Sequence, residues 1–243
     1  GISLNPLAAE MFGKVTGLGR GKGGHMHLFS VDKKFGCSGI VGAGLPQACG
    51  AALAAKKKCK DWVAVTFFGE GAANQGSFHE SLNLAALWNL PVIFICEDNK
   101  YAISVTREES TAIASNADRA GSYGIPGVRV ENNDAIEVYD VVGEAVSRAR
   151  SGGGPSLIEV RTDRYLGHFQ GDAEAYRPQD EVNKLRENDP LDRLQKQLKK
   201  DGISETEISQ IQERAKTAVQ EAYDFARESA YPDVSEATQH VFV

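Results

Sequence analysis

Two polar residues that could ligate a metal each follow an apolar segment of the sequence. Glu70 lies in Gly69-Glu70-Gly71, after the apolar run 62–68, and Asn99 follows the apolar run 91–96. A carboxylate and an amide oxygen are hard ligands that suit Mg²⁺ or Ca²⁺. Backbone N–H groups at the start of a helix can hold a phosphate, so a cation here could bridge Glu70 to a diphosphate. Spacing alone also allows a solvated loop acid and a turn asparagine, and both interpretations stay open at this point.

A βαβ unit would bring these two residues together. The runs 62–68 and 91–96 predict buried strands, and residues 75–89 predict an amphipathic helix between them. Strands connected in this way are parallel, with a right-handed crossover. Their carboxyl ends therefore meet at one edge of the sheet, where ligands usually bind. Because both runs are almost continuously apolar, we expect a sheet that is covered on both faces.

The other patterns predict an α/β fold with a mostly parallel sheet and helices on both faces. Further helices are expected at residues 5–16, 45–56, 134–151, from 190 and from 204, and further strands at 127–130 and 156–161. Residues 165–180 are polar and are expected to be irregular. We therefore expect an α/β domain over residues 1–180 and a helical extension, packed on it, over residues 181–243.

Composition excludes several classes of protein. The chain has 27 Lys and Arg against 33 Asp and Glu, a net charge of −6, which argues against binding nucleic acid through its phosphates. Apolar runs all fall short of the roughly 20 residues that a membrane span requires, and the first residues lack a signal-peptide pattern. The four cysteines form no CxxC pair and are expected to be reduced. A cytoplasmic protein without nucleic-acid or membrane partners is expected.

A second glycine motif has a less favourable context. Residues 19–24 match GxGxxG, but no strand precedes them and no helix follows directly. The hypothesis that the chain is a nicotinamide-binding oxidoreductase would rest on this motif alone. The interpretation of the loop as a flexible connector fits the sequence better.

The segment from Gly69-Glu70-Gly71 to Asp98-Asn99 resembles the thiamine diphosphate motif that begins GDG and ends NN. From Leu7 almost to its end, the chain resembles the alpha subunit of the E1 component of 2-oxo acid dehydrogenase complexes and the related acetoin dehydrogenases. The segments 21–27, 39–42 and 167–168 share in this resemblance. It implies the thiamine diphosphate-binding fold, with thiamine diphosphate and Mg²⁺ as cofactors.

The resemblance also implies roles for single residues. Glu70, Asn99 and the backbone carbonyl of Tyr101 would ligate Mg²⁺. His27 and His168 would be catalytic residues at the mouth of the active site, His168 on a loop that orders over the cofactor. The backbone groups of Gly39 and Val41 would hold the aminopyrimidine ring of the cofactor. The remaining implied cofactor-binding residues are the turn at the diphosphate (Gly69, Glu70, Gly71, Ala72), Asn99 and His168.

The chain departs from the family pattern at several positions. Glu70 stands where most members have Asp, and Asp98 replaces the first Asn of the NN pair. Phe169 occupies the place of a regulatory serine in mitochondrial pyruvate enzymes, so phosphorylation there is not expected. Nothing in the chain matches the Tyr-Arg segment that the family carries before Leu7, and the glutamate that protonates the cofactor belongs to the beta subunit. We therefore expect the chain alone to be inactive.

The implied reaction cleaves a C–C bond next to a carbonyl and passes the acyl unit to a lipoyl-bearing E2 acyltransferase. A beta subunit is the expected partner, in an α₂β₂ heterotetramer. Residues 167–172 resemble acetoin dehydrogenases, whereas residues 101–104 resemble branched-chain enzymes. Acetoin is the favoured substrate, with pyruvate and branched-chain 2-oxo acids as alternatives. A non-catalytic subunit that keeps the fold is the alternative of another class.

Overall fold

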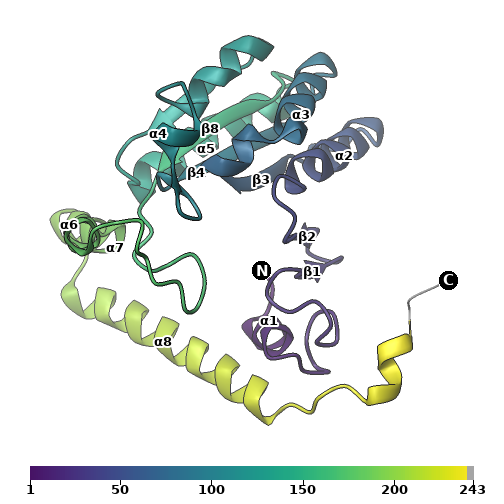
Figure 1. Cartoon of the computed structure of the whole chain (residues 1–243), viewed down its shortest axis with the longest axis vertical. Helices are drawn as coiled ribbons and strands as arrows, with labels where there is room; N and C mark the ends of the chain where they lie inside the picture. The colour runs from purple at the N-terminus through teal and green to yellow at the C-terminus, as the bar shows by residue number, and fades with distance from the viewer. Residues whose placement is uncertain (240–243) are drawn as a thin grey trace. The chain divides into compact units, whose positions relative to one another are not determined.

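The computed structural model describes residues 1–239 (Figure 1). The chain forms two compact units. Unit 1 contains residues 1–40 and the described residues from Lys199 onward, and unit 2 contains residues 41–198. This division by contacts differs from the expected domain boundary after residue 180, which stays a prediction. Within residues 1–239, no helix is both long and apolar enough to cross a membrane.

Unit 2 is built on a parallel sheet of four strands. Their order is β3 (Ala64–Gly69), β4 (Val92–Asp98), β8 (Ser156–Arg161) and β7 (Gly127–Val130), and every neighbouring pair is parallel. Helix α3 (Gly76–Leu87) connects β3 to β4, so the predicted βαβ unit is confirmed. The expected α/β class with a parallel sheet is confirmed as well.

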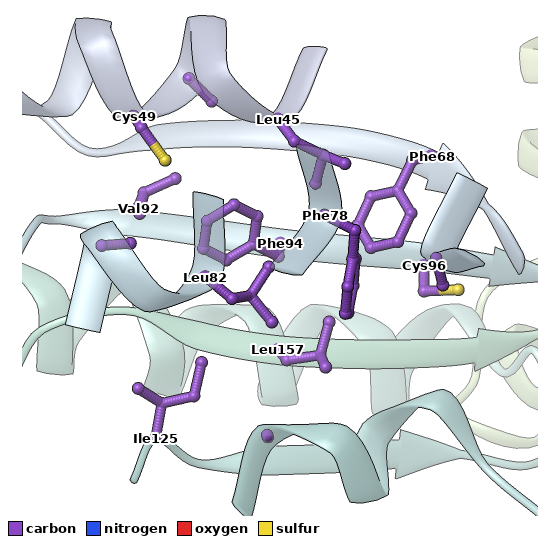
Figure 2. Close-up of a cluster of buried hydrophobic side chains, with 14 of the residues drawn as sticks. Leu45, Cys49, Phe68, Phe78, Leu82, Val92, Phe94, Cys96, Ile125 and Leu157 are labelled. Carbon is purple, nitrogen blue, oxygen red and sulfur yellow. The ribbon is translucent and has the colours of Figure 1, made fainter. Parts of the chain in front are cut away.

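Helices cover the two faces of this sheet with separate apolar clusters. On one face, α2 (Gly44–Lys57) and α3 pack on the strands, and Figure 2 shows Leu45, Phe78 and Phe94 meeting there. On the other face, α5 (Ala135–Arg150) packs Val138, Val142 and neighbouring residues against Ile93, Ile95 and Ile158. Asp134 is the N-cap of α5, because its side chain accepts the N–H groups of Ile136 and Glu137.

The prediction that both apolar strands are covered on both faces is wrong for β3. Val65 and Phe67 remain 41% and 63% exposed, whereas Thr66 and Phe68, which alternate with them, are buried. The physical reason is position: β3 is an edge strand, and α5 packs on β4, β7 and β8. Within residues 1–239, the face of β3 that contacts α2 is buried and the opposite face is exposed.

Short elements connect the main ones in unit 2, and the sequence did not predict most of them. They are η1 (Glu70–Asn74), β5 (Tyr101–Ala102), β6 (Val105–Thr106), α4 (Arg107–Ser110), η2 (Asn116–Tyr123), α6 (Gln179–Arg186) and α7 (Pro190–Lys200), which extends two residues into unit 1. All four cysteines are free, as expected.

Unit 1 pairs its first helix with its longest one. Helix α1 (Leu4–Met11) packs on α8 (Glu205–Glu228), and the rings of Phe12 and Tyr223 meet edge to face at 5.4 Å. A reciprocal capping box of Ser204 and Glu207 begins α8, the helix that the sequence predicted from residue 204. The remaining elements are β1 (Phe29–Ser30), β2 (Phe35–Gly36) and η3 (Val234–Thr238).

The glycine-rich loop of unit 1 is fixed around one buried carboxylate. Glu10, fully buried on α1, accepts the backbone N–H groups of Gly19 at 2.7 Å and Gly21 at 2.9 Å through Oε2. Its Oε1 accepts the N–H group of Gly23 at 2.7 Å. The loop is therefore a defined structure, and its interpretation as a flexible connector is wrong.

Replacing Glu10 with glutamine is expected to destabilise this loop. An amide keeps one acceptor oxygen but turns an NH₂ group toward a backbone donor, so at least one partly buried N–H group loses its partner. We expect Glu10→Gln to lower the free energy of unfolding by about 1–3 kcal/mol. Urea unfolding measures this change, with Glu221→Gln on the exposed side of α8 as the control. Equal midpoints for the two variants would contradict the prediction.

Candidate functional site

Glu70 and Asn99 meet at the carboxyl edge of the sheet. Glu70 begins η1 directly after β3, and Asn99 follows β4, which lies beside β3. The Glu70 side chain is almost fully buried, at 2% exposure, and its Oε2 lies 3.3 Å from the backbone nitrogen of Asn99, which donates to it. The parallel pairing thus places these two predicted residues together, as the βαβ argument requires.

Among the residues that the structure describes, no basic side chain forms an ion pair with the Glu70 carboxylate. Burial raises the pKa of Glu70, and hydrogen bonds from its own N–H group and that of Asn99 only partly oppose this effect. The positive charge of Arg164 lowers the pKa of Glu70 further, but it is the weakest of these influences. A metal cation bound here would favour the charged carboxylate and offset its desolvation.

The turn after β4 holds the amide oxygen of Asn99 in a defined position. The amide oxygen of Asn99 accepts the N–H group of Tyr101 at 3.1 Å, and Lys100 between them adopts a left-handed φ of 73°. An amide oxygen has two lone pairs, so Asn99 keeps one acceptor position. A carboxylate, an amide oxygen and a backbone carbonyl suit Mg²⁺ better than zinc. Within residues 1–239, no group of three or more His, Cys, Asp or Glu side chains could hold a metal.

The turn that carries Glu70 packs closely against the strand that carries Tyr101. A Cβ atom on Gly71 would lie 2.6 Å from the Cβ of Ala102, which is too close for any side chain. Ala72 is buried behind it, and Gly69 is the last residue of β3. The absence of a side chain at Gly71 therefore lets the two halves of the candidate metal site approach each other.

Val41 and Gly42 lie just before α2, and Gly42 lies against the start of α3, the helix that follows the Glu70 turn. Gly42 has a φ of 82°, and a Cβ on it would lie 2.7 Å from Oγ of Ser77 at the start of α3. Val41 is 61% exposed although it is apolar. The segment before α2 is thus fixed against the helix that follows the Glu70 turn.

His168 lies on a loop that Asp172 holds together. One carboxylate oxygen of Asp172 accepts the N–H group of His168 at 2.8 Å and the hydroxyl of Tyr176 at 2.8 Å, and the other accepts the N–H group of Glu174 at 3.0 Å. The loop lines an open hollow of about 390 Å³, formed by residues 166–172 and Glu174. His168 itself is exposed.

Arg164 connects this loop to the turn after β4, and sequence reasoning missed it. Its Nη2 donates to Oη of Tyr176 at 2.6 Å and to the carbonyl of Ile103 at 2.8 Å. Its guanidinium lies 5.8 Å from the ring centroid of Tyr101. Its Nε and Nη1 have no hydrogen-bond partner among the described residues. An arginine three residues after a strand end, at the ligand edge of a parallel sheet, was the signal that could have found it.

The structure places the remaining predicted residues in unit 1. His27 is exposed and directly precedes Leu28, whose carbonyl accepts the N–H group of Cys37 at 2.9 Å. A Cβ on Gly39 would lie 3.1 Å from Sδ of Met26. The His27 segment and the Gly39 segment therefore lie together within unit 1, whereas the Glu70 and His168 groups belong to unit 2.

The His168 loop is expected to loosen in acid. Hydrogen bonds from the N–H groups of Glu174 and His168 and from the Tyr176 hydroxyl lower the pKa of Asp172 below its ordinary value of 3.8. A lowered pKa means that the stabilisation is present above that ordinary value and is lost as pH falls through the lower one. Amide hydrogen exchange should therefore show protected His168 and Glu174 amides down to about pH 4 and faster opening below it. Asp172→Asn should open at every pH, and equal protection in this variant would contradict the prediction.

Comparison with known proteins decides the family. A family model described as "Dehydrogenase E1 component" matches residues 1–235. This chain belongs to the dehydrogenase E1 component family. The E1 chain is 47% identical over 245 residues to the alpha subunit of the acetoin:2,6-dichlorophenolindophenol oxidoreductase of Bacillus subtilis, and this alignment covers all of the chain and 73% of the relative.

Other relatives agree with this assignment. The corresponding alpha subunit of Cupriavidus necator is 43% identical, over the whole chain and 74% of the relative. The alpha subunit of the pyruvate dehydrogenase E1 component of Rhizobium meliloti is also 43% identical, over 97% of the chain and 69% of the relative. The E1 chain is thus an alpha subunit of a thiamine diphosphate-dependent oxidoreductase.

Proposed function

We propose that this E1 alpha chain holds thiamine diphosphate through a Mg²⁺ ion at the β3–β4 edge. Glu70, the amide oxygen of Asn99 and the backbone carbonyl of Tyr101 ligate the metal, and the N–H groups of Gly71 and Ala72 bind the diphosphate. The observation that carries this proposal is the buried Glu70 carboxylate, whose Oε2 lies 3.3 Å from the nitrogen of Asn99 and which no Lys, Arg or His side chain of residues 1–239 pairs with. The bound cofactor supplies the means to cleave a C–C bond next to a carbonyl.

The other predicted residues orient the cofactor and handle the substrate. The backbone groups of Gly39 and Val41 hold the aminopyrimidine ring, and Gly69 leaves room at the end of β3 for the diphosphate. His27 and His168 face the substrate, and His168 does so from the loop that Asp172 holds. The tight hydrogen bonding of that loop supports a role in which the position of the imidazole matters.

The proposed partners are a beta subunit, in an α₂β₂ heterotetramer, and a lipoyl-bearing E2 acyltransferase that receives the acyl unit. The proposed substrate is acetoin. Two relatives named for acetoin, at 47% and 43% identity, support this choice together with the segment Gly167–Asp172. Pyruvate is the second candidate, because a pyruvate dehydrogenase alpha subunit is also 43% identical.

Calorimetry tests the cofactor site. With a beta subunit and Mg²⁺ present, thiamine diphosphate should bind saturably, and chelation of the metal should abolish the binding heat. A mixture that shows no heat with Mg²⁺ present would refute the proposal and favour a subunit that keeps the fold without the chemistry.

An assay of the reconstituted α/β pair tests the substrate. Acetoin, pyruvate and a branched-chain 2-oxo acid are supplied in turn, with 2,6-dichlorophenolindophenol as the electron acceptor. Acetoin should give the highest kcat/KM. Turnover of pyruvate without turnover of acetoin would overturn the substrate choice but leave the cofactor site intact.

A further inference from the structure

Four charged side chains lie beneath the turn that carries Asn99. Asp98 on β4 and Glu159 on β8 are completely buried. Nη1 of Arg161 lies 2.9 Å from Oδ2 of Asp98, and Nη1 of Arg107 lies 3.6 Å from the same oxygen. Arg107 also lies 3.9 Å from Oε1 of Glu159. Two carboxylates and two guanidinium groups therefore balance in charge, which buried ions require.

The same group fixes the backbone of the turn Asp98–Tyr101 at several points. Oδ1 of Asp98 accepts the N–H group of Lys100 at 2.9 Å, and the carbonyl of Asp98 accepts the N–H group of Thr162 at 2.9 Å. The carbonyl of Lys100 accepts the N–H group of Arg107 at 2.8 Å. Because Lys100 has a left-handed φ of 73°, which costs energy for a residue with a side chain, the turn needs such support.

The buried carboxylate at position 98 needs a positively charged partner. Asp98 stands where the family motif has a neutral asparagine, and an unpaired buried carboxylate would be costly. Arg161 is its partner in the register of β4 and β8, so the compensating charge comes from the neighbouring strand. Asp98 is adjacent to Asn99 in the sequence, and any movement of Asp98 moves the candidate ligand.

We propose that Asp98 and Arg161 form a positioning pair that holds Asn99 and the Tyr101 carbonyl beside Glu70, with Arg107 closing the turn from the other side. The pair touches neither metal nor cofactor and acts through the turn Asp98–Tyr101. This inference rests on the proposed metal site for its function, whereas its effect on the turn exists without metal.

Metal affinity provides the first test, with Mn²⁺ as the probe. Electron paramagnetic resonance measures free Mn²⁺ over the α/β assembly saturated with thiamine diphosphate. D98N and R161Q should each weaken Mn²⁺ binding about tenfold, and the double variant D98N/R161Q should return to within about threefold of the unchanged protein. If the two charges acted on the cation only by electrostatics, the two variants would differ in sign. D98N, which removes a negative charge, would weaken Mn²⁺ binding, whereas R161Q, which removes a positive charge, would tighten it. Tighter binding by R161Q, or no rescue in the double variant, would overturn the proposal.

Amide hydrogen exchange on the metal-free assembly provides the second test. The amides of Lys100 and Tyr101 should exchange about tenfold faster in D98N and R161Q, while the amides of β7 stay unchanged. The matched control is Glu131→Gln, which breaks the exposed Arg129–Glu131 pair of 2.9 Å next to β7. Arg161→Lys, which keeps the charge but loses the guanidinium geometry, is a second variant should D98N fail to fold.

The two tests separate this inference from the proposed function. If the unchanged assembly binds no Mn²⁺, the proposed metal site fails, and the exchange rates still decide whether the pair holds the turn. If Mn²⁺ binds but both single variants match the unchanged protein in affinity and exchange, the positioning pair is refuted and the metal site stands.

Discussion

Glu70→Gln is expected to weaken Mg²⁺-dependent binding of thiamine diphosphate strongly, while the ligand-free protein keeps its melting temperature or gains stability. The two effects have opposite signs because of burial. Desolvation raises the pKa of the Glu70 carboxyl, which means that the charged carboxylate destabilises the folded state. A neutral amide at this position removes that destabilisation. The same charge is what a cation at this edge requires.

The expected loss of affinity is large. Residues that only support a metal ligand cost about 10–100-fold when they are replaced, and removal of the charged ligand itself should reach at least 100-fold. Calorimetry of the α/β assembly in Mg²⁺ measures the loss, and a thermal melt of the ligand-free chain measures the stability. Glu80→Gln, an exposed glutamate on α3, is the control and should change neither. Unaltered affinity in Glu70→Gln would remove Glu70 from the site.

Phe78→Ala is expected to cause the largest loss of stability. Phe78 is fully buried at the start of α3, and its ring lies 5.7 Å from that of Phe68 on β3 (Figure 2). Truncation of a buried phenylalanine costs about 3–5 kcal/mol, since it leaves a cavity that its neighbours only partly fill. That is a substantial part of the roughly 5–15 kcal/mol that stabilises a typical domain.

Urea unfolding measures this cost, with Phe67→Ala as the control. Phe67 lies next to Phe68 on β3, but its side chain is 63% exposed, so its truncation should cost under about 1 kcal/mol. Since α3 follows the Glu70 turn, Phe78→Ala should also weaken cofactor binding in the assembly. A larger loss in Phe67→Ala than in Phe78→Ala would contradict the assignment of the core.

The parts of the fold that the sequence predicted well are those whose signals are local. Strands β7 and β8 have the predicted bounds, and helices α5 and α8 begin directly after residues 134 and 204, where the sequence predicted their starts. The two-residue strands β5 and β6 were missed, because two residues cannot show a period. The exposure of Val65 was missed for another reason: what covers a strand is decided by elements distant in the sequence.

The residues of the candidate site also fall into those with a local signal in the sequence and those whose role depends on elements distant in the sequence. Glu70 and Asn99 were predicted because each follows an apolar run that had to be a strand. Arg107 and Arg161 were not, because their partners come from other strands. A signal did exist at Glu159, a charged residue inside the apolar strand β8, since such residues are rarely buried without a partner.

The hydrogen bonds that Glu10 accepts explain why the GxGxxG match of residues 19–24 is misleading. Loops of this kind bind phosphate by pointing successive N–H groups at one anion. Here the N–H groups of Gly19, Gly21 and Gly23 already surround an anion that belongs to the chain itself. A dinucleotide phosphate would have to displace the Glu10 carboxylate, which already occupies the anion-binding position of this loop. The glycines of the loop therefore stabilise the structure of unit 1 and do not bind a nucleotide.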